Sequence, residues 1–516
     1  MLKETIDILT SYPISQKRCI MGNIAIARGA IEAGVNGVFS YPGTPSTEIS
    51  EVFNYVDSFL SNPDYRQIYP VQANTKIYFE YSINEKIALE KAIAYSIGNR
   101  SSMCVMKNVG MNVASDALMS ITYQTISAPL VIVVCDDPGC HSSSNEQDSR
   151  YWGAMANVPL LNPSNPNEAK EFTVLAFRLS GKLKLPVIIR TTTRVSHSRG
   201  IVNFGVINAD DRIAGFERIP EHINIPARTA AAHSRLLEKL NDPEISAMQR
   251  ESCKIISGNE NTRYGIITSG VASEYVCEVL HDNKINEQVY VLNIGLVNPF
   301  PEKVVADFLK NNLQKILIVE ELEPITENAI RVIAQKECIN TEILGKGFSG
   351  LTVAGEFNID LIKQTLFEFL DLQIGKVQKQ PLENVKEFTE LLPPRPPVLC
   401  AGCPHRSTFY LLKLVIPREE SELILCGDIG CFGLGALPPL KMIDTINHMG
   451  MSISMAQGLS EALTRYENSK IIDVDQDNNQ HCNSPKPLKT VALVGDGTFF
   501  HSGLASLVNA VYTRAN

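Results

Sequence analysis

Residues 84–137 decide the fold, and they are NEKIALEKAIAYSIGNRSSMCVMKNVGMNVASDALMSITYQTISAPLVIVVCDD. A glutamate opens a helix of small residues, an apolar strand follows, residues 109–112 start a second helix, and residues 128–134 form the next strand. Short apolar strands that alternate with helices are typical of parallel βαβ units. We therefore predict an α/β fold that is built on parallel sheets.

The same alternation extends outward from this stretch and divides the 516-residue chain. A chain of this length exceeds one hydrophobic core, so several domains are expected. A run of prolines, LLPPRPPVL, indicates a connector, because proline continues neither a helix nor a central strand. The predicted regions are an α/β domain at 1–200, a connection with one helix at 201–258, a second α/β domain at 259–375, the proline-rich connector at 376–399 and a third α/β domain at 400–516.

The composition excludes several classes of protein. A net charge of -9 leaves no general basic field for binding a nucleic-acid backbone. No apolar run approaches the roughly 20 residues that cross a bilayer, and acids and a proline interrupt the first residues too often for a signal peptide. Twelve cysteines are too few for a disulfide scaffold in so long a chain. We expect a cytoplasmic protein that binds neither nucleic acid nor membrane.

The closing stretch, VALVGDGTFFHSGLASLVNAVYTRAN, covers residues 491–516. It predicts a buried strand, a tight turn on Gly495, Asp496 and Gly497, and a helix after Thr498. Backbone N–H groups at such a turn can face an anion, and the carboxylate can bind Mg²⁺. The same tripeptide is also common in tight turns that bind nothing, so by itself it leaves both interpretations open.

The stretch 84–137 resembles the pyrimidine-binding domain of thiamine diphosphate enzymes in the order and spacing of its elements. In that family a glutamate hydrogen-bonds the aminopyrimidine ring and promotes removal of the thiazolium C2 proton. Glu85 falls in that place. The alternative for Glu85 is a solvated helix acid that pairs with a nearby lysine. Glu90, later on the same helix, is predicted to be a surface residue.

Six further motifs, spread over nearly the whole chain, resemble the large subunit of indolepyruvate:ferredoxin oxidoreductase. They are YPGTPSTEI at 41–49, DDPGCHSSSNEQDSR at 136–150, CAGCPHRSTFY at 400–410, GDIGCFGLGALPPL at 427–440, HMGMSISMAQGL at 448–459 and GDGTFFHSGLASLVNAVY at 495–512. The resemblance implies a pyrimidine-binding domain first, a transketolase C-terminal-like domain in the middle and a diphosphate-binding domain last.

The resemblance also implies a reaction and partners. An aryl 2-oxoacid of the indolepyruvate type loses CO₂, two electrons pass singly through iron–sulfur centres to ferredoxin, and the acyl group passes to coenzyme A. Thiamine diphosphate, Mg²⁺ and [4Fe–4S] clusters are the implied cofactors, and a smaller β subunit completes an (αβ)₂ assembly. Two alternatives stay open: a non-oxidative thiamine diphosphate-dependent arylpyruvate decarboxylase or acetohydroxyacid-synthase relative, and a non-catalytic scaffold subunit.

Individual site residues follow from the resemblance by position. Thr44 matches a turn near the substrate carboxylate, with a plain helix cap as its alternative. Asn112 belongs to a turn near the thiazolium. His405 is expected to contact the diphosphate or to act near C2. The expected walls of the diphosphate pocket are Gly427, Asp428, Gly450, Ser452, Gly495, Asp496, Gly497 and Thr498, with Asp496 as the Mg²⁺ ligand.

The cysteines of the third region are candidate metal ligands. Cys400 and Cys403 form a CxxC pair, and two thiolates at this spacing can grip one metal ion. The resemblance favours Cys431 over Cys426 as a third ligand of an iron–sulfur cluster, and no fourth ligand is evident. Structural zinc and unmetallated thiols are the alternatives.

The sequence departs from the family pattern at its end. The family continues into a ferredoxin-like module with repeated cysteine runs, and an asparagine-containing Mg²⁺ segment follows its Gly-Asp-Gly turn at a distance. Only nineteen residues follow Gly497 here. We therefore expect the chain to be part of a larger enzyme whose clusters lie mostly in the missing module. Alone, it should bind thiamine diphosphate poorly and transfer no electrons.

Overall fold

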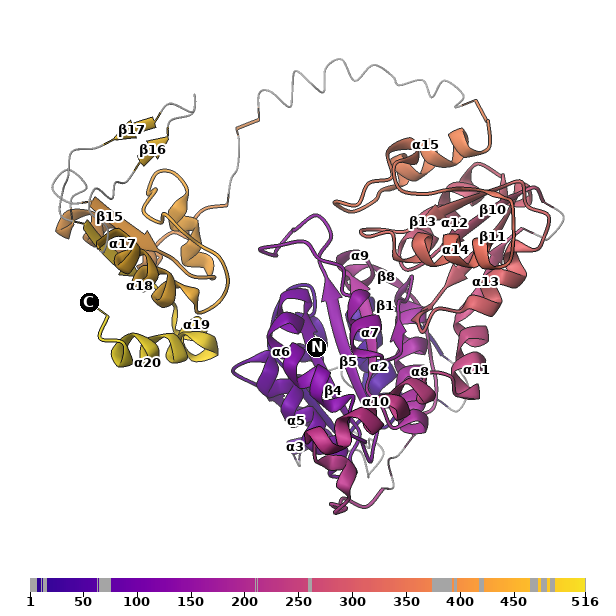
Figure 1. Cartoon of the computed structure of the whole chain (residues 1–516), viewed down its shortest axis with the longest axis horizontal. Coiled ribbons are helices and arrows are strands. Elements are labelled where there is room, and N and C mark those ends of the chain that lie inside the picture. Colours follow the sequence, from indigo (N-terminus) through magenta and orange to yellow (C-terminus); the bar gives the residue numbers. More distant parts are fainter. Residues whose placement is uncertain are drawn as a thin grey trace. The chain divides into compact units, whose positions relative to one another are not determined.

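The computed structural model divides the chain into two compact units, Met1–Gly375 and Lys376–Asn516 (Figure 1). Each unit is described by itself. The predicted connector at 376–399 lies mostly outside the described residues. The structure describes residues 7–10, 12, 16–62, 64, 76–208, 210, 212–258, 262–373, 392–393, 397–416, 422–464, 472–474, 480–482 and 488–515.

A seven-stranded sheet forms the centre of the first unit, in the order β12-β6-β7-β5-β4-β2-β3. Its strands pair in parallel except at the edge, where β12 runs antiparallel to β6. Every residue of β5 is buried, as expected for a parallel strand that is covered on both faces. The strands are β2 (Gly37–Ser40), β3 (Tyr78–Tyr81), β4 (Ser102–Lys107), β5 (Leu130–Asp136), β6 (Leu160–Leu161), β7 (Val187–Thr192) and β12 (Leu296–Asn298).

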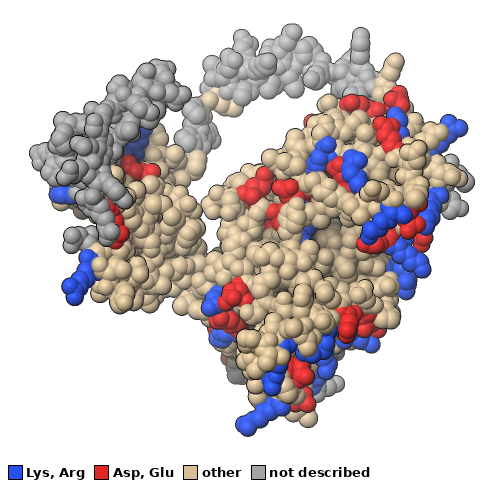
Figure 2. Space-filling model, in the orientation of Figure 1, with Lys and Arg blue, Asp and Glu red and all other residues tan. Residues whose placement is uncertain are grey.

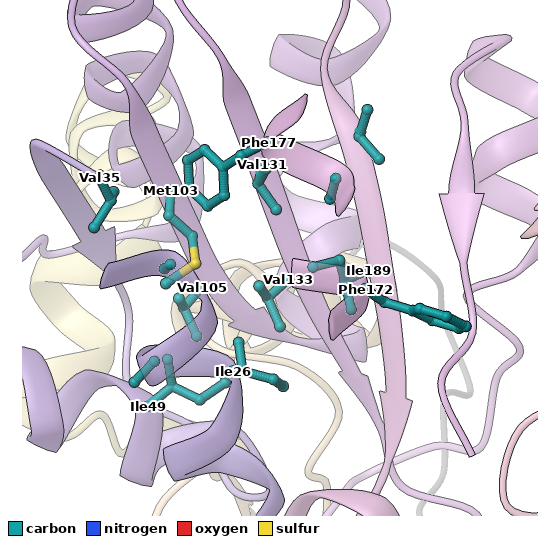
Figure 3. Close-up of a cluster of buried hydrophobic side chains, with 14 of the residues drawn as sticks. Ile26, Val35, Ile49, Met103, Val105, Val131, Val133, Phe172, Phe177 and Ile189 are labelled. Carbon is teal, nitrogen blue, oxygen red and sulfur yellow. The ribbon is translucent and has the colours of Figure 1, made fainter. Parts of the chain in front are cut away.

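Helices cover both faces of this sheet and create two hydrophobic clusters. Alternate residues of β5 divide between them: Val131 and Val133 pack with α2, α3 and α8, whereas Ile132 and Val134 pack with α5 and α6. Figure 3 shows the first cluster, in which Ile26 and Ile49 meet the side chains of β4 and β5. The helices are α2 (Gly22–Glu32), α3 (Thr47–Ser61), α5 (Glu85–Ile97), α6 (Asn108–Ile121), α7 (Tyr151–Ala156), α8 (Pro166–Leu183) and α9 (Thr193–His197), and a separate antiparallel pair joins β1 (Gln16–Met21) to β8 (Arg199–Phe204).

A second sheet of the same unit has the order β14-β13-β10-β11-β9 and is parallel except for β9. Its own hydrophobic cluster lies between the strands and helices α12 and α15. The strands are β9 (Cys253–Ser257), β10 (Tyr264–Thr268), β11 (Val289–Ile294), β13 (Lys315–Val319) and β14 (Glu342–Leu344), and the helices are α12 (Ala272–Asp282), α13 (Glu302–Leu309), α14 (Ile325–Lys336) and α15 (Ile359–Phe369).

The prediction of one helix between residues 201 and 258 was wrong. Two helices occupy this segment, α10 (Pro226–Lys239) and α11 (Pro243–Ser252), and its last residues form β9 of the second sheet. Pro243 cannot continue α10, but it suits the first position of a new helix. The Asp242 side chain caps that helix by accepting from the Glu244 amide at 2.8 Å.

The second unit is smaller, and its β15 (Glu422–Cys426) and β18 (Leu488–Ala492) pair in parallel. Its hydrophobic core includes Phe409, Leu425 and Phe432. The predicted buried strand before Gly495 is only half-buried at Val491 and Ala492, so that expectation was wrong. The other elements are α17 (Pro404–Val415), η4 (Cys431–Ala436), α18 (Met451–Thr464), β16 (Ile472–Val474), β17 (Gln480–Cys482), α19 (Asp496–Thr498), the π-helical turn η5 (Phe499–Gly503) and α20 (Leu504–Tyr512).

Charges are mixed over the surface that Figure 2 shows. Acidic and basic side chains alternate over the first unit, and most of the visible described surface of the second unit is uncharged. On the described part of this face, Lys and Arg side chains do not gather into one basic patch. Within the described ranges, we find no helix with the length and apolar character needed to span a membrane.

Candidate active site

The first group of predicted site residues lies at one edge of the seven-stranded sheet. Strands β2, β4, β5 and β7 are parallel, so their carboxyl ends meet at this edge. The chain leaves the edge through a turn at 41–46 after β2, through Lys107 and Asn108 after β4, and through a loop at 137–147 after β5. Open α/β sheets bind ligands outside the carboxyl ends of their strands.

Glu85 is a buried carboxylate at this edge. It is the first residue of α5, whose start is capped by the Asn84 side chain accepting from the Lys86 amide at 2.8 Å. Its exposed fraction is 4%, so the alternative of a solvated helix acid is wrong. Glu90 is exposed instead and pairs with Lys86 at 3.4 Å, as the sequence predicted.

The first turn of α6 packs directly on the Glu85 carboxylate. A Cβ atom built on Gly110 would lie 2.7 Å from Glu85 Oε1, so only glycine leaves this carboxylate in place. Asn108 is fully buried, and neither polar atom of its side chain has a partner among the described residues. An unpartnered buried amide beside a buried carboxylate is a feature of a site that receives a polar ligand.

Asn112 lies one turn further along α6 and faces the loop at 137–147. Its side-chain amide and that of Gln147 exchange hydrogen bonds of 2.9 and 3.1 Å, and Gln147 also donates to the Asn108 carbonyl at 3.1 Å. Asn112 is exposed. It therefore holds this loop against α6 at the rim of the edge.

Thr44 belongs to the turn at 41–46 and is not a helix cap. The cap of α3 is Ser46, whose amide donates to the Gly43 carbonyl at 2.8 Å. The Thr44 carbonyl accepts from Ser142 Oγ at 3.2 Å, which joins this turn to the loop at 137–147. The helix-cap alternative for Thr44 was therefore wrong.

Lys107 and Tyr41 add chemistry at the same edge. The Lys107 ammonium donates to the Ser142 carbonyl at 3.0 Å. Burial lowers the pKa of Lys107, although the charges of Asp137, Cys140 and Glu85 oppose this shift. Burial also raises the pKa of Tyr41, and the charge of Glu85 adds to that shift. Sequence reasoning missed Lys107, and its one signal is a basic residue directly after a buried strand.

Asp137 organises the loop that follows β5. Its carboxylate accepts from the Ser142 amide and from Ser143 Oγ, both at 2.7 Å, and from Thr193 Oγ1 at 2.8 Å. Burial alone would raise the pKa of Asp137, but these hydrogen bonds outweigh burial and lower it. The loop is thus fixed by one buried carboxylate.

A buried ion-pair network ties this edge to the second sheet of the unit. Arg150 donates to Asp148 at 2.6 Å and to Glu320 at 2.5 Å, and Arg190 donates to Asp136 at 2.8 Å. Burial alone would lower the pKa of Arg150. The charges of Asp148 and Glu320 outweigh burial, so the pKa is raised. The network thus holds the edge of the first sheet against the second sheet through buried contacts.

The second group of predicted residues lies in the second unit, where Asp428 joins two turns. Asp428 follows β15 and is fully buried. Its carboxylate accepts from the Gly450 amide at 2.8 and 3.0 Å, and from the Ser452 amide at 3.3 Å and hydroxyl at 3.0 Å. Asp428 therefore positions the turn at 448–452 against its own turn at 427–430.

The Gly-Asp-Gly stretch packs near these two turns. A Cβ atom on Gly495 would lie 2.9 Å from the Phe432 ring, and one on Gly450 would lie 2.5 Å from Ser502 Cβ. Asp496 and Gly497 are exposed and form the first helical turn of α19, where the sequence predicted a separate turn. The buried Thr498 donates from Oγ1 to the Gly495 carbonyl at 3.0 Å.

His405 also meets this group, whereas the described cysteines are not gathered into a set of metal ligands. The His405 ring lies 5.7 Å from the Phe432 ring in an edge-to-face contact. Cys400 and Cys431 are exposed and Cys403 is half-buried. In the part of the chain that the structure describes, no three His, Cys, Asp or Glu side chains are grouped to hold a metal ion. The predicted cluster on these cysteines thus has no support from this geometry.

Comparison with known proteins decides the family. The chain is 38% identical to the indolepyruvate oxidoreductase subunit IorA of Pyrococcus abyssi over 524 residues, which covers 100% of this chain and 76% of that protein. The corresponding subunit of Methanothermobacter thermautotrophicus is 35% identical over 98% of this chain and 75% of its own length. The chain belongs to the indolepyruvate oxidoreductase subunit IorA family. No family model matches it.

Membership of the IorA family confirms the resemblance inferred from the motifs and makes the chain a subunit of an oxidoreductase. A solved structure supports the fold: 2-oxoglutarate:ferredoxin oxidoreductase from Magnetococcus marinus aligns with a TM-score of 0.52 and 18% identity, over 69% of this chain and 66% of that one. The predicted α/β fold class with parallel sheets is therefore confirmed.

Proposed function

We propose that this chain is the thiamine diphosphate-binding subunit of an enzyme that oxidatively decarboxylates aryl 2-oxoacids of the indolepyruvate type. The products are CO₂ and an aryl-acetyl-coenzyme A, and the electrons pass to ferredoxin. The observation that carries this proposal is the buried Glu85 carboxylate, held against Gly110 at the carboxyl edge of a parallel sheet. Relatives named for indolepyruvate oxidoreductase support it along the whole chain.

Glu85 would hold the aminopyrimidine ring of the cofactor by a hydrogen bond. Burial makes this carboxylate a strong and fixed acceptor, because little water competes for it. The absence of a side chain at Gly110 lets the carboxylate pack directly on α6, and the buried Asn108 amide offers a donor and an acceptor in the same turn. Bound thiamine diphosphate supplies a thiazolium that stabilises a carbanion.

The three turns of the second unit would hold the diphosphate. Backbone N–H groups at the start of the helix that opens with Asp496 can face phosphate oxygens, as at other helix N-termini. The exposed Asp496 carboxylate is a suitable Mg²⁺ ligand. The His405 ring packs on Phe432, which lies beside Gly495, and on this ground His405 is assigned to the diphosphate. Asp428 keeps these turns together, and Thr498 fixes the shape of the last one.

The remaining assignments are part of the same proposal. The regions 1–200, 259–375 and 400–516 are a pyrimidine-binding, a transketolase C-terminal-like and a diphosphate-binding domain. A smaller subunit, ferredoxin and coenzyme A are the partners, in an (αβ)₂ assembly in the cytoplasm. The described cysteines support no step through a cluster of their own. We assign the [4Fe–4S] clusters of this proposal mostly to other parts of the enzyme, and this assignment comes from the resemblance.

The test uses the chain purified together with its smaller subunit. Indolepyruvate, coenzyme A, thiamine diphosphate and Mg²⁺ should together reduce ferredoxin or a viologen dye, and omission of thiamine diphosphate should abolish the reduction. Glu85→Gln should lower kcat by about 100-fold or more, the usual contribution of a proton-transfer group. Glu90→Gln, on the exposed side of the same helix, is the matched control and should leave kcat unchanged.

Two outcomes would contradict the proposal. Release of CO₂ without reduction of any acceptor would favour the non-oxidative decarboxylase. Unchanged turnover in Glu85→Gln would favour a scaffold role for this chain. Iron analysis of the same preparation distinguishes the non-oxidative decarboxylase from the oxidoreductase, because a decarboxylase needs no iron.

A further inference from the structure

Lys107 lies across the turn that the sequence associates with the substrate. It is the last residue of β4, and it is half-buried. Its aliphatic stem packs over Gly43, where a Cβ atom would lie 2.8 Å from Lys107 Cδ. Its ammonium reaches the loop after β5 and donates to the Ser142 carbonyl at 3.0 Å. Two separate segments thus hold the side chain in one place.

The other cations near this edge are already paired. Arg190 is paired with Asp136, Arg150 with Asp148 and Glu320, and the exposed Arg194 with Glu356. Lys107 forms no direct ion pair with a carboxylate in the described ranges, although the charge of the nearby Asp137 acts on it. The Asp137 carboxylate accepts from Ser142, Ser143 and Thr193.

This arrangement leaves a positive charge that favours an anion. A lysine ammonium has three donors, and among the described residues Lys107 donates to one carbonyl, that of Ser142. Burial of the ammonium has a free-energy cost that the charges of Asp137, Cys140 and Glu85 offset only in part, as the lowered pKa of Lys107 reflects. An anion that binds here removes that cost and gains charge-assisted hydrogen bonds. The edge is therefore prepared for a negatively charged group beside the turn at 41–46.

The chemistry of the substrate identifies that group. In a 2-oxoacid the carboxylate is bonded directly to the carbonyl carbon that reacts, so its binding group must lie near the group that holds the cofactor. Lys107 meets this condition, because it ends β4 just before the first turn of α6, where Gly110 packs against the Glu85 carboxylate. We propose that Lys107 binds the carboxylate of the 2-oxoacid and that Ser142 orients the ammonium for this contact. This inference rests on the proposed function.

The test compares three variants of the enzyme with its smaller subunit. Lys107→Met keeps the stem over Gly43 and removes the charge, and Lys107→Arg keeps the charge. Lys182→Gln, an exposed lysine of α8, is the matched control. Lys107→Met should raise KM for indolepyruvate by about 10- to 100-fold, the usual worth of a hydrogen bond to a charged group, with a smaller effect on kcat. Lys107→Arg should restore much of the affinity, and Lys182→Gln should match the unaltered enzyme.

A second measurement addresses the carboxylate directly. Indole-3-propionate and its neutral amide are unreactive analogues that differ in this group alone. The unaltered enzyme should bind the acid about tenfold or more tightly than the amide, and Lys107→Met should bind both equally. The ratio of the two affinities, acid over amide, is measured on Lys107→Gln as well. The conclusion is drawn from whichever variant keeps the thermal midpoint of the unaltered enzyme.

The outcomes separate this inference from the proposed function. An unaltered enzyme that oxidises no aryl 2-oxoacid overturns both. An active enzyme whose Lys107→Met variant keeps its KM and its preference for the acid overturns the role of Lys107 alone. A Lys107→Met variant that loses affinity for thiamine diphosphate while its KM for indolepyruvate is unchanged would assign the ammonium to a phosphate instead, and this also overturns the inference.

Discussion

In the first unit the candidate site depends on buried side chains, whereas in the second unit it depends on backbone turns. Glu85 and Asp137 are buried carboxylates at the carboxyl edge of the seven-stranded sheet. The second unit instead assembles its site from glycine-containing turns, with Asp428 as the buried residue that joins them. We infer that substitutions in the first unit mainly change chemistry, and that substitutions in the second unit mainly change the stability and shape of the site.

The largest expected effect tests the chemistry of the first unit. Gly110→Ala should reduce kcat/KM for indolepyruvate by about 100-fold, because its Cβ atom would displace the Glu85 carboxylate, and small misplacements have effects of this size. The thermal midpoint should fall as well, because the added methyl group overlaps a buried side chain. Steady-state kinetics and calorimetry on one preparation check both parts. A variant with full activity would show that the contact between α6 and Glu85 has no role in the reaction.

The next effect tests the second unit. Asp428→Asn should lower the free energy of unfolding of this unit by about 1–3 kcal/mol, because one carboxylate oxygen becomes an amide that cannot accept from Gly450 or Ser452. Faster hydrogen exchange at the Gly450 and Ser452 amides would check this. Asp282→Asn, at an exposed aspartate of the first unit, is the control and should leave these amides unchanged. Unchanged exchange in Asp428→Asn would show that other contacts hold the two turns.

Much of the first unit could be predicted from the sequence, because hydrophobic periodicity reports burial directly. The buried β5 and the helix that opens with Glu85 follow from such patterns. The segment 201–258 was harder, since a proline that ends one helix and starts the next leaves the polar pattern almost continuous. Sheet pairing of β9 depends on residues far away in the sequence, so local patterns could not reveal it.

The candidate site was predicted less evenly. Glu85 was found because its role needs one residue type at one position in a helix. Lys107 was missed because its stem packs on Gly43, which lies on another strand's turn, and no local pattern records that contact. The structural role of Asp428 likewise depends on an amide at Gly450 that only the folded chain brings near. Contacts between distant segments therefore limit what the sequence alone can give.

A smaller effect concerns the pH response of the first unit. The hydrogen bonds to Asp137 lower its pKa, so they stabilise the loop at 137–147 above the ordinary aspartate pKa of about 4. This contribution is lost as pH falls through the lowered pKa. Hydrogen-exchange protection of the Ser142 amide should therefore decrease at acidic pH, and Asp137→Asn should decrease it already at pH 7. The amide of Asn162, which donates to the Gly295 carbonyl, is the control. If the Ser142 amide were equally protected in the unaltered protein and in Asp137→Asn, Asp137 would not be the residue that holds the loop.

The smallest expected effect is an increase in stability, and it distinguishes two glycines of the second unit. Gly450 has a φ of 83° and no space for a side chain, whereas a Cβ atom on Gly458, within α18, meets nothing within 4 Å. Gly458→Ala should therefore raise the free energy of unfolding by about 0.5–1 kcal/mol, because glycine loses more conformational freedom than alanine in a helix. Calorimetry should show a slightly higher midpoint for Gly458→Ala and a lower one for Gly450→Ala. If both variants were equally stable, the turns of this unit would be less constrained than their contacts imply.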